Sequence, residues 1–584
     1  MSRYALAIRF LSEPRQAVKL ALILVFSTMI AVNSRAWFAT AQSLADRLPQ
    51  DAQVTCFVDP QEFKTWFESG SVTVNGAVKP ADGLAFPGRP NCNFYKRSWQ
   101  MFLWLTSLTP PRYEGGGGLI FNSPVFYGVS TPDPNDDKRI FIPHTVSEGP
   151  ITVSGVRVAQ RGPNNLPVVL SKQRKILEVA PEKTAPGGKP LFKDRSGKEI
   201  EVYRATRGPN QMLLLFDKYG NLIRFPKQNA KLKAQFSANP IVQRFIVEDS
   251  PVPVFVDPFG NIIEIEVGQA GGDEVLMTKN TSPIYYTTAV NDVFAYFLTG
   301  TKNGGITPAP TRFPTTREEL EKITKFASER GETLIDPNVL AVEIKASWVE
   351  AAELPDPSSY ITIWAKIPMY KKSPTEWTLK DKTKTTQLAL IGLHVVGSAK
   401  GHPEMIWATF EHFGNTPNAK YKYKIGVSGT KYWLEPAENW LFCGTFSGPF
   451  NFISRVRAVG NALRPINGYD TIGPSDIHRV NPWGVPRGND SNNTDIISIN
   501  NSVLGKLHDG DVRKNYKLIG ATWIDCVKKD CKEVGTNRLA NSTMETYQQG
   551  FNCFNCHSVS KSNMLGTLEG GGLSHIWGPL KPLF

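Results

Sequence analysis

The stretch Gln-Leu-Ala-Leu-Ile-Gly-Leu-His-Val-Val, residues 387–396, is almost entirely apolar. Such a run of aliphatic and β-branched residues predicts a buried strand. Residues 341–348 and 361–367 alternate or run apolar in the same way. We therefore expect several strands between residues 342 and 413. The fold class predicted is α+β, with a large β-rich, loop-rich body.

A repeated turn motif predicts two hairpins closer to the N-terminus. Asp-Lys-Tyr-Gly-Asn-Leu-Ile, residues 217–223, recurs as Asp-Pro-Phe-Gly-Asn-Ile-Ile, residues 257–263. Apolar residues precede both copies, and the Gly-Asn pair supplies the positive φ angles that a tight hairpin turn needs. These features predict a β-rich region over residues 42–304.

A Pro- and Thr-rich segment, residues 304–316, is the best candidate for a linker. A helix is predicted to follow, from Arg317 to about Arg330. Thr316 and Glu319 have the spacing of a capping box. Leu320, Ile323 and Phe326 would share one face of this helix.

Chain length and composition predict several domains. The chain has 584 residues, of which 41% are hydrophobic, so it can bury real cores. We expect a signal peptide at 1–41, β-rich regions at 42–304 and 317–535, and a C-terminal segment at 536–584.

The first 41 residues have the order of a secretory signal peptide. A basic head is followed by an apolar run, residues 20–32, and by Ala39-Thr-Ala41 as the cleavage signature. An apolar run this short spans a bilayer poorly; an uncleaved anchor is the alternative. The sequence predicts export to the bacterial periplasm or cell surface, with no integral membrane span after removal of the signal.

The chain is basic, with a formal charge of +13. No block of basic residues interleaved with aromatics indicates nucleic-acid binding. The simpler interpretation of this charge is a solvated basic surface. The more specific interpretation is docking to an acidic redox partner protein or to an anionic membrane.

Cys553-Phe-Asn-Cys556-His557 matches the Cys-x-x-Cys-His pattern of covalent haem attachment. Two cysteines three residues apart can each form a thioether to a haem vinyl group, and the following histidine can then bind the iron. Residues 542–545 form another capping-box pattern, which predicts a short helix ending at Gly550. The C-terminal segment is therefore predicted to be a short helical segment that carries one haem c.

Three other interpretations of this motif are weaker. A zinc knuckle needs a second pair of ligands, and a thioredoxin-like pair needs a βαβ setting. A disulfide would leave His557 unexplained.

The sixth iron ligand has several candidates. His575, within the apolar Leu-Ser-His-Ile-Trp stretch of residues 573–577, is preferred over Met564, which lies only seven residues from His557. Met544 or another residue of the large body is a third option, and an open coordination site a fourth.

A second group of polar residues lies in the predicted strands. His394 is expected to face Glu411 or His412 across a hairpin, and His402 lies between the two strands. A histidine with a carboxylate could form a proton relay or a metal corner. A buried hydrogen-bonded pair that fixes the strand register is the simpler interpretation. His394, Glu411 and His412 are thus weak candidates for catalytic residues.

The other five cysteines cannot all pair with one another. Cys526 and Cys531 are close enough to bridge locally, and Cys56 with Cys92 could staple the N-terminal region, which leaves Cys443. The predicted export favours at least one disulfide.

The chain resembles large exported mono-haem proteins of the cytochrome c family. The resemblance rests on residues 343–348, 392–394 and 407–412, on residues 539–545 leading into the Cys-x-x-Cys-His motif, and on Cys92 followed by residues 98–104. It implies haem c and electron transfer, and no particular substrate.

Three hypotheses about function follow. The first is electron transfer through the covalent haem. The second is a haem-dependent periplasmic oxidoreductase whose β-rich body binds a substrate, with a peroxidase-like enzyme as its variant if the iron has an open site. The third is a β-rich binding module with the haem as a redox tag.

Overall fold

The computed structural model describes residues 47–113, 118–130, 138–144, 151–152, 168–170, 176–179, 184–185, 189–193, 198–207, 213–224, 241–245, 254–256, 262–263, 275–435, 439–442, 456–459, 462–465, 471–527, 530–546, 549, 552–557 and 573–584. The predicted signal peptide, Met564 and Cys443 lie outside these residues.

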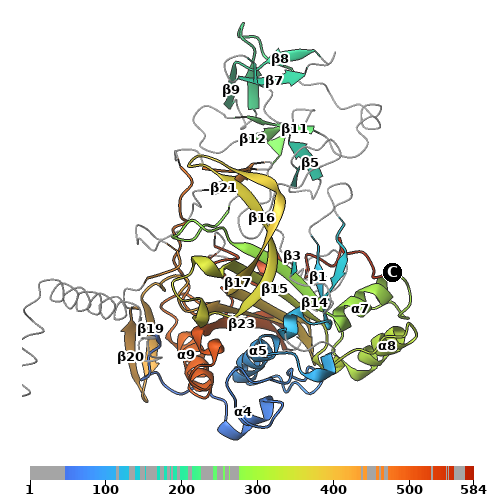
Figure 1. The fold of residues 1–584 in the computed structure, drawn as a ribbon, viewed down its shortest axis with the longest axis vertical. Coiled ribbons are helices and arrows are strands. Elements are labelled where there is room, and N and C mark those ends of the chain that lie inside the picture. Colours follow the sequence, from blue (N-terminus) through green and yellow to red (C-terminus); the bar gives the residue numbers. More distant parts are fainter. Residues whose placement is uncertain are drawn as a thin grey trace, which may run out of the picture. The chain divides into compact units, whose positions relative to one another are not determined.

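The largest element is a twelve-stranded sheet (Figure 1). Neighbours along its main path are antiparallel. The path runs through β2 (Phe141–Pro143), β1 (Phe126–Val129), β14 (Tyr285–Asn291), β15 (Val342–Glu350), β17 (Trp377–Ala399), β18 (His402–His412), β23 (Tyr516–Val527) and β24 (Asp530–Gly535). The remaining strands branch from it: β16 (Thr362–Lys372), β3 (Ile151–Thr152), β21 (Val456–Val459) and β22 (Ala462–Pro465).

The predicted strands of residues 342–413 are confirmed as β15, β16, β17 and β18. The stretch 387–396 lies within β17, where β15 and β18 pair on either side of it. The β-rich character of the body is confirmed as well, because this antiparallel sheet dominates the fold.

The two faces of the sheet differ. Two helices that sequence patterns did not predict, α5 (Asn91–Leu105) and α9 (Asp490–Leu504), contact each other and the strands, and Figure 1 shows them lying side by side below the sheet. Phe102 of α5 stacks on Phe410 of β18 with ring centroids 4.4 Å apart. Because side chains alternate along a strand, Thr409 and Glu411 point to the opposite face.

The predicted helix after residue 316 is confirmed as α8 (Arg317–Ser328). The Thr316 side chain accepts from the Glu319 backbone, and the Glu319 side chain accepts from the Thr316 backbone. Leu320, Ile323 and Phe326 are buried as expected. Helix α7 (Asp292–Lys302) packs against α8. The sheet takes strands from both sides of residues 304–316, and the domain boundaries stay predictions.

The first repeated turn motif lies in a hairpin, whereas the turn residues of the second, 257–261, lie outside the described part of the chain. In the first copy Gly220 has a φ of 80°, and Ile223 donates its backbone N–H to Leu215 across the turn. The strands on either side of that second copy, β12 and β13, pair antiparallel. The smaller sheets comprise β4 (Val168–Leu170), β5 (Ile176–Val179), β11 (Ile241–Phe245), β12 (Val254–Val256) and β13 (Ile262–Ile263); β6 (Thr184–Ala185), β7 (Lys189–Lys193) and β8 (Glu199–Glu201); β9 (Arg204–Arg207) and β10 (Leu213–Phe216); and β19 (Tyr421–Ile425) and β20 (Gly429–Trp433).

The other described helices are short. Helix α4 (Pro60–Trp66) begins at Asp59, whose side chain accepts from two first-turn amides. Helix α10 (Cys553–Cys556) carries the Cys-x-x-Cys-His motif. Within the described part of the chain, we find no helix that combines the length and the apolar character needed to cross a membrane.

Candidate haem-binding site

The Cys-x-x-Cys-His motif forms one helical turn. Cys553 and Cys556 are the first and last residues of α10, and the backbone N–H of His557 donates to the Cys553 carbonyl (2.9 Å). Just before the helix, Asn552 donates its side-chain amide to Glu533 of β24 (2.6 Å). The two cysteines therefore belong to one helical turn, and the residue before that turn is bonded to the edge strand of the sheet.

The ring of His557 is oriented by a backbone carbonyl. Its Nδ1–H donates to the carbonyl of Leu573 (2.9 Å). In the neutral ring this bond assigns the proton to Nδ1 and the lone pair to Nε2, which is the arrangement of a metal-ligating histidine. Burial, and next the charge of His575, lower the pKa of His557 well below its ordinary value, so the ring is neutral at pH 7.

Aromatic side chains surround this ring. Trp407 of β18 lies with its centroid 4.3 Å from that of His557, and it also meets Phe554 edge-on at 5.9 Å. Both Trp407 and Phe554 pack against a buried cluster that includes Leu573 and Trp577. An apolar wall of this kind suits a porphyrin, which is itself large, flat and apolar.

His575 lies beside His557. The two rings stack with centroids 4.1 Å apart and planes 11° apart. Its neighbours Leu573, Ser574, Ile576 and Trp577 are buried, whereas His575 itself is exposed, contrary to the expectation that they would bury it. Stacked rings are not arranged to hold one metal ion from opposite sides, so the distal role of His575 stays a prediction.

The polar group around His394 is arranged differently from the prediction. His394 faces neither Glu411 nor His412. Its Nε2 meets the carboxylate of Glu545 (2.7 Å), and Lys345 of β15 lies 3.7 Å from the same carboxylate. Burial alone would raise the pKa of Glu545, but His394 and Lys345 outweigh it and lower the pKa to about 2.

Glu411 is the anchor of the segment that leads to α10. It forms a buried ion pair with Arg479 and accepts from both the backbone N–H and the hydroxyl of Ser542 (each 2.6 Å). Arg479 also donates to the carbonyl of Ala540 (3.0 Å). Glu411 therefore fixes residues 540–542 on the sheet, which agrees with the simpler, structural interpretation of this residue.

His412 lies on the opposite face of β18. Its ring stacks on Tyr360 with centroids 3.7 Å apart, and its Nδ1 accepts from the backbone N–H of Gly414. His402 contacts Glu404 (2.7 Å). The structure thus separates the three weak catalytic candidates: His394 and Glu411 both contact the segment that precedes the motif, at Glu545 and at Ser542, whereas His412 packs on Tyr360.

The predicted capping-box helix at residues 542–545 is wrong. These residues form turns. The backbone N–H of Ser542 donates to Glu411, and the Glu545 carboxylate accepts instead from the backbone N–H of Asn541 (3.1 Å). The Ser542 backbone N–H and the Glu545 carboxylate, which a capping box would join to each other, therefore have other partners.

Residues 541–545 fit closely against the sheet at Gly392. A Cβ on Gly392 would lie 2.6 Å from the hydroxyls of Ser347 and Thr543. Asn541 donates its amide to Thr409 and to the Phe410 carbonyl (3.0 and 3.1 Å). The polar face of β15, β17 and β18 is thus the docking surface of this segment.

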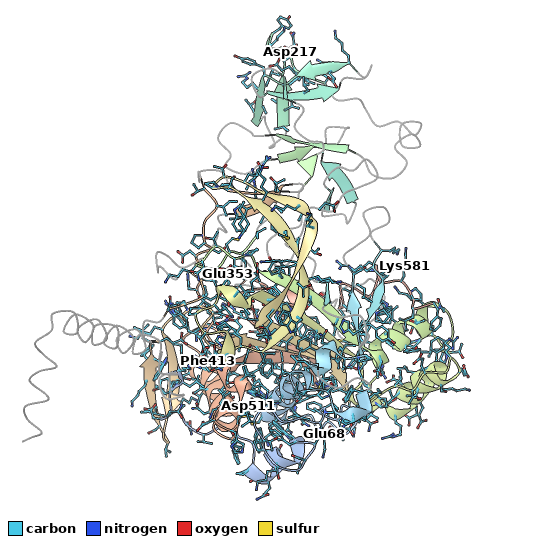
Figure 2. All side chains as sticks on the ribbon, in the orientation of Figure 1. Glu68, Asp217, Glu353, Phe413, Asp511 and Lys581 are labelled. Carbon is cyan, nitrogen blue, oxygen red and sulfur yellow. A yellow bond between two sulfur atoms is a disulfide. The ribbon has the colours of Figure 1, made fainter. Side chains whose placement is uncertain are left out.

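The residues after the motif return to the same face. Ser574 donates to the carboxylate of Glu343 on β15 (2.7 Å), and burial raises the pKa of Glu343 to about 7. Lys302 at the end of α7 donates to the carbonyls of Trp577 and Leu580 (each 2.6 Å). The backbone of Lys581, labelled in Figure 2, pairs with that of Arg139.

Sequence patterns missed Glu545 and Lys345 as partners of His394. Glu545 entered the prediction only as a helix cap, and it lies 151 residues from His394 in the chain. No local signal joins them.

The residues that would hold a haem c, Cys553, Cys556 and His557, nonetheless fit that group, since one helical turn carries them and the His557 ring has the tautomer of a ligand. Comparisons with protein-family models, curated proteins and solved structures find no match to this chain.

Proposed function

We propose that the protein is an exported mono-haem c-type cytochrome that transfers electrons through a haem attached at Cys553 and Cys556 and bound at its iron by His557. The observation that carries the proposal is the bond from His557 Nδ1–H to the Leu573 carbonyl, directly after the two cysteines of one helical turn. A haem c supplies one-electron transfer between ferric and ferrous iron.

The protein's own residues would tune this site. Trp407 and Phe554 exclude water from one side of His557. The Leu573 carbonyl makes the imidazole more basic, which strengthens it as a ligand. Glu545 keeps a negative charge between His394 and Lys345, on the face of the sheet that also presents Trp407.

Export and partner choice belong to the same proposal. The basic head, apolar run and cleavage signature of residues 1–41 favour the periplasm or cell surface. The chain remains basic without residues 1–41, and this charge favours an acidic redox partner protein, whose docking would weaken as salt is added.

The test is the absorption spectrum of the full chain produced in a host that attaches haem c, oxidised and reduced, with and without CO. We expect a covalent haem that stays with the denatured chain. Replacing both Cys553 and Cys556 with Ala should abolish attachment, whereas the same change at Cys526 and Cys531 should not. A chain without covalent haem, or a double Cys553/Cys556 variant that keeps it, contradicts the proposal.

A haem-dependent oxidoreductase is the second candidate function. The observation in its favour is the His394–Glu545–Lys345 cluster, because a histidine bonded to a carboxylate can relay a proton. A CO-responsive spectrum would indicate an open iron site and favour this candidate. A spectrum indifferent to CO favours the electron carrier.

A further inference from the structure

The predicted disulfide between Cys56 and Cys92 is confirmed, and it borders a pocket of about 550 Å³. Cys56 is buried, with 2% of its surface exposed, whereas Cys92 is half-buried. Cys92 is therefore the more accessible of the two residues. Arg89, Asp495 and Asp525 are the charged residues that line the same pocket.

Cys92 lies in the first turn of α5, a helix of 15 residues. Pro90 caps this helix without a side-chain hydrogen bond, and the first turn contains no acidic residue. The positive end of the helix is thus left uncompensated by side chains. A thiolate at this position is stabilised, which makes Cys92 a good leaving group.

The charged groups around Cys92 do not cancel this effect. Asp525 is engaged in an ion pair with Arg89. Burial raises the pKa of Asp495, whose carboxylate hydrogen-bonds Thr55 and lies near the opposite charge of Lys424. Tyr95 is buried and its pKa is raised, so it stays neutral. Lys96, one turn into α5, pairs with Glu62 of α4 (2.8 Å).

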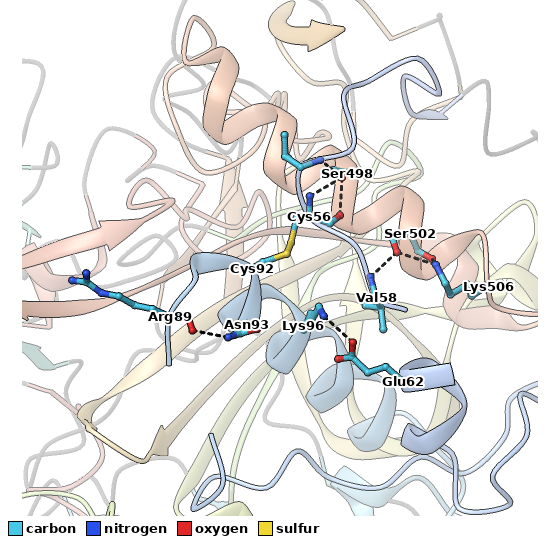
Figure 3. The surroundings of a disulfide bond; sticks show 11 residues. Cys56, Val58, Glu62, Arg89, Cys92, Asn93, Lys96, Ser498, Ser502 and Lys506 are labelled. Atoms are coloured by element: carbon cyan, nitrogen blue, oxygen red, sulfur yellow. Dashed lines mark hydrogen bonds and ion pairs between the residues drawn. A yellow bond between two sulfur atoms is a disulfide. The ribbon is translucent and has the colours of Figure 1, made fainter. Parts of the chain in front are cut away.

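Both cysteines are anchored independently of their bond (Figure 3). Ser498 of α9 accepts from the Cys56 backbone N–H (3.0 Å) and donates to the Cys56 carbonyl (2.7 Å). Two residues on, Val58 donates to Ser502 (2.9 Å). Cys92 belongs to a helix whose Trp99 and Phe102 are fully buried. Cleavage of the disulfide would leave both sulfur atoms near each other.

We propose that Cys56–Cys92 is a reversible thiol–disulfide exchange site whose reductant is a dithiol that enters the pocket. A donor thiolate attacks the Cys92 sulfur, the bond to Cys56 breaks, and Cys56 leaves as a thiolate that takes up a proton. The second donor thiol then attacks the donor sulfur of the mixed disulfide and releases the Cys92 thiolate. The protein gains two electrons and the donor becomes a disulfide. This activity is independent of the haem.

The first test is equilibration of the full chain in dithiothreitol and in glutathione redox buffers, followed by alkylation and mass analysis of the peptides that contain Cys56 and Cys92. We expect reversible reduction under conditions in which near-ultraviolet circular dichroism is unchanged. Reduction only after unfolding, or loss of folded structure on reduction, would identify the bond as a structural staple and overturn the proposal.

The second test compares single thiols. Cys56→Ser leaves Cys92, and Cys92→Ser leaves Cys56 as the matched control. The pH midpoint of Cys92 alkylation by iodoacetamide should lie at least one unit below that of Cys56. Asn91→Asp adds a carboxylate to the first turn and should raise the Cys92 midpoint. Equal midpoints for the two cysteines contradict the proposal. If a variant does not fold, the redox titration of the unmodified chain described above decides the question.

Discussion

At the residue scale, the Glu411–Arg479 pair tests what a buried charge contributes at the candidate site, because both side chains are almost completely buried. Glu411→Gln leaves the Arg479 charge unpaired, and we expect a loss of about 3–5 kcal/mol in the free energy of unfolding. Urea denaturation measures it. Glu376→Gln removes one partner of the exposed Arg464–Glu376 pair and should cost less than about 1 kcal/mol. Equal losses in the two variants would show that burial does not set the strength of the first pair.

A second residue-scale prediction concerns pH. Burial raises the pKa of Glu343 to about 7 from an ordinary value of 4.5. The folded protein therefore holds this proton more tightly than the unfolded chain, and the stability contributed by Glu343 falls as pH rises from 4.5 to 7.

Glu343→Gln should remove that dependence. We compare the free energy of unfolding of the variant with that of the unmodified protein. This difference should shift in favour of the variant by about 1–3 kcal/mol when the pH is raised from 5 to 8. Urea denaturation at the two pH values gives the difference. An equal effect of the substitution at pH 5 and pH 8 would mean that Glu343 is already ionised at pH 5 in the folded protein.

At the element scale, the fit between β17 and residues 541–545 depends on the missing side chain of Gly392. Gly392→Ala places a Cβ 2.6 Å from two hydroxyls and 2.8 Å from the Asn541 side chain. We expect a loss of about 1–3 kcal/mol, together with faster amide hydrogen exchange in residues 540–546. Gly488→Ala, where a Cβ meets nothing within 4 Å, is the control. Unchanged exchange in the Gly392 variant would contradict the close fit.

Also at this scale, the sequence predicts some elements and not others for identifiable reasons. The strands of residues 342–412 have regular apolar patterns, and α8 has a capping box with one apolar face. Helix α5 buries Arg97 and Ser98 together with its apolar residues, so polar side chains interrupt the apolar period that would have marked it. Helix α9 is rich in Asn and Ser, which favour turns, so its sequence does not predict a helix. In the fold, the Asn500 side chain donates to the Leu518 carbonyl and accepts from the Leu518 N–H.

At the scale of the whole molecule, sequence patterns identify one part of the candidate site and miss the other part. Cys553, Cys556 and His557 are adjacent in sequence, so the pattern alone identifies them as a unit. The contacts that position this unit involve other parts of the chain: Trp407 on β18 and the Leu573 carbonyl contact His557, and Glu343 on β15 holds Ser574, the neighbour of Leu573. Only folding brings them together. The pairing of His394 with Glu545 is the clearest case, since register predicted a cross-strand partner and a distant turn supplied it.

The docking of both flanks of α10 on one sheet face also sets an order of events in folding. The β17–β18 hairpin closes over a short turn, whereas the contacts of Ser542 with Glu411 and of Ser574 with Glu343 close loops of 131 and 231 residues. Long loops close later because more chain entropy is lost before any contact forms. The β17–β18 hairpin is therefore expected to form before either contact, and the Cys-x-x-Cys-His turn stays reachable by other molecules until the strands that receive its flanks are in place.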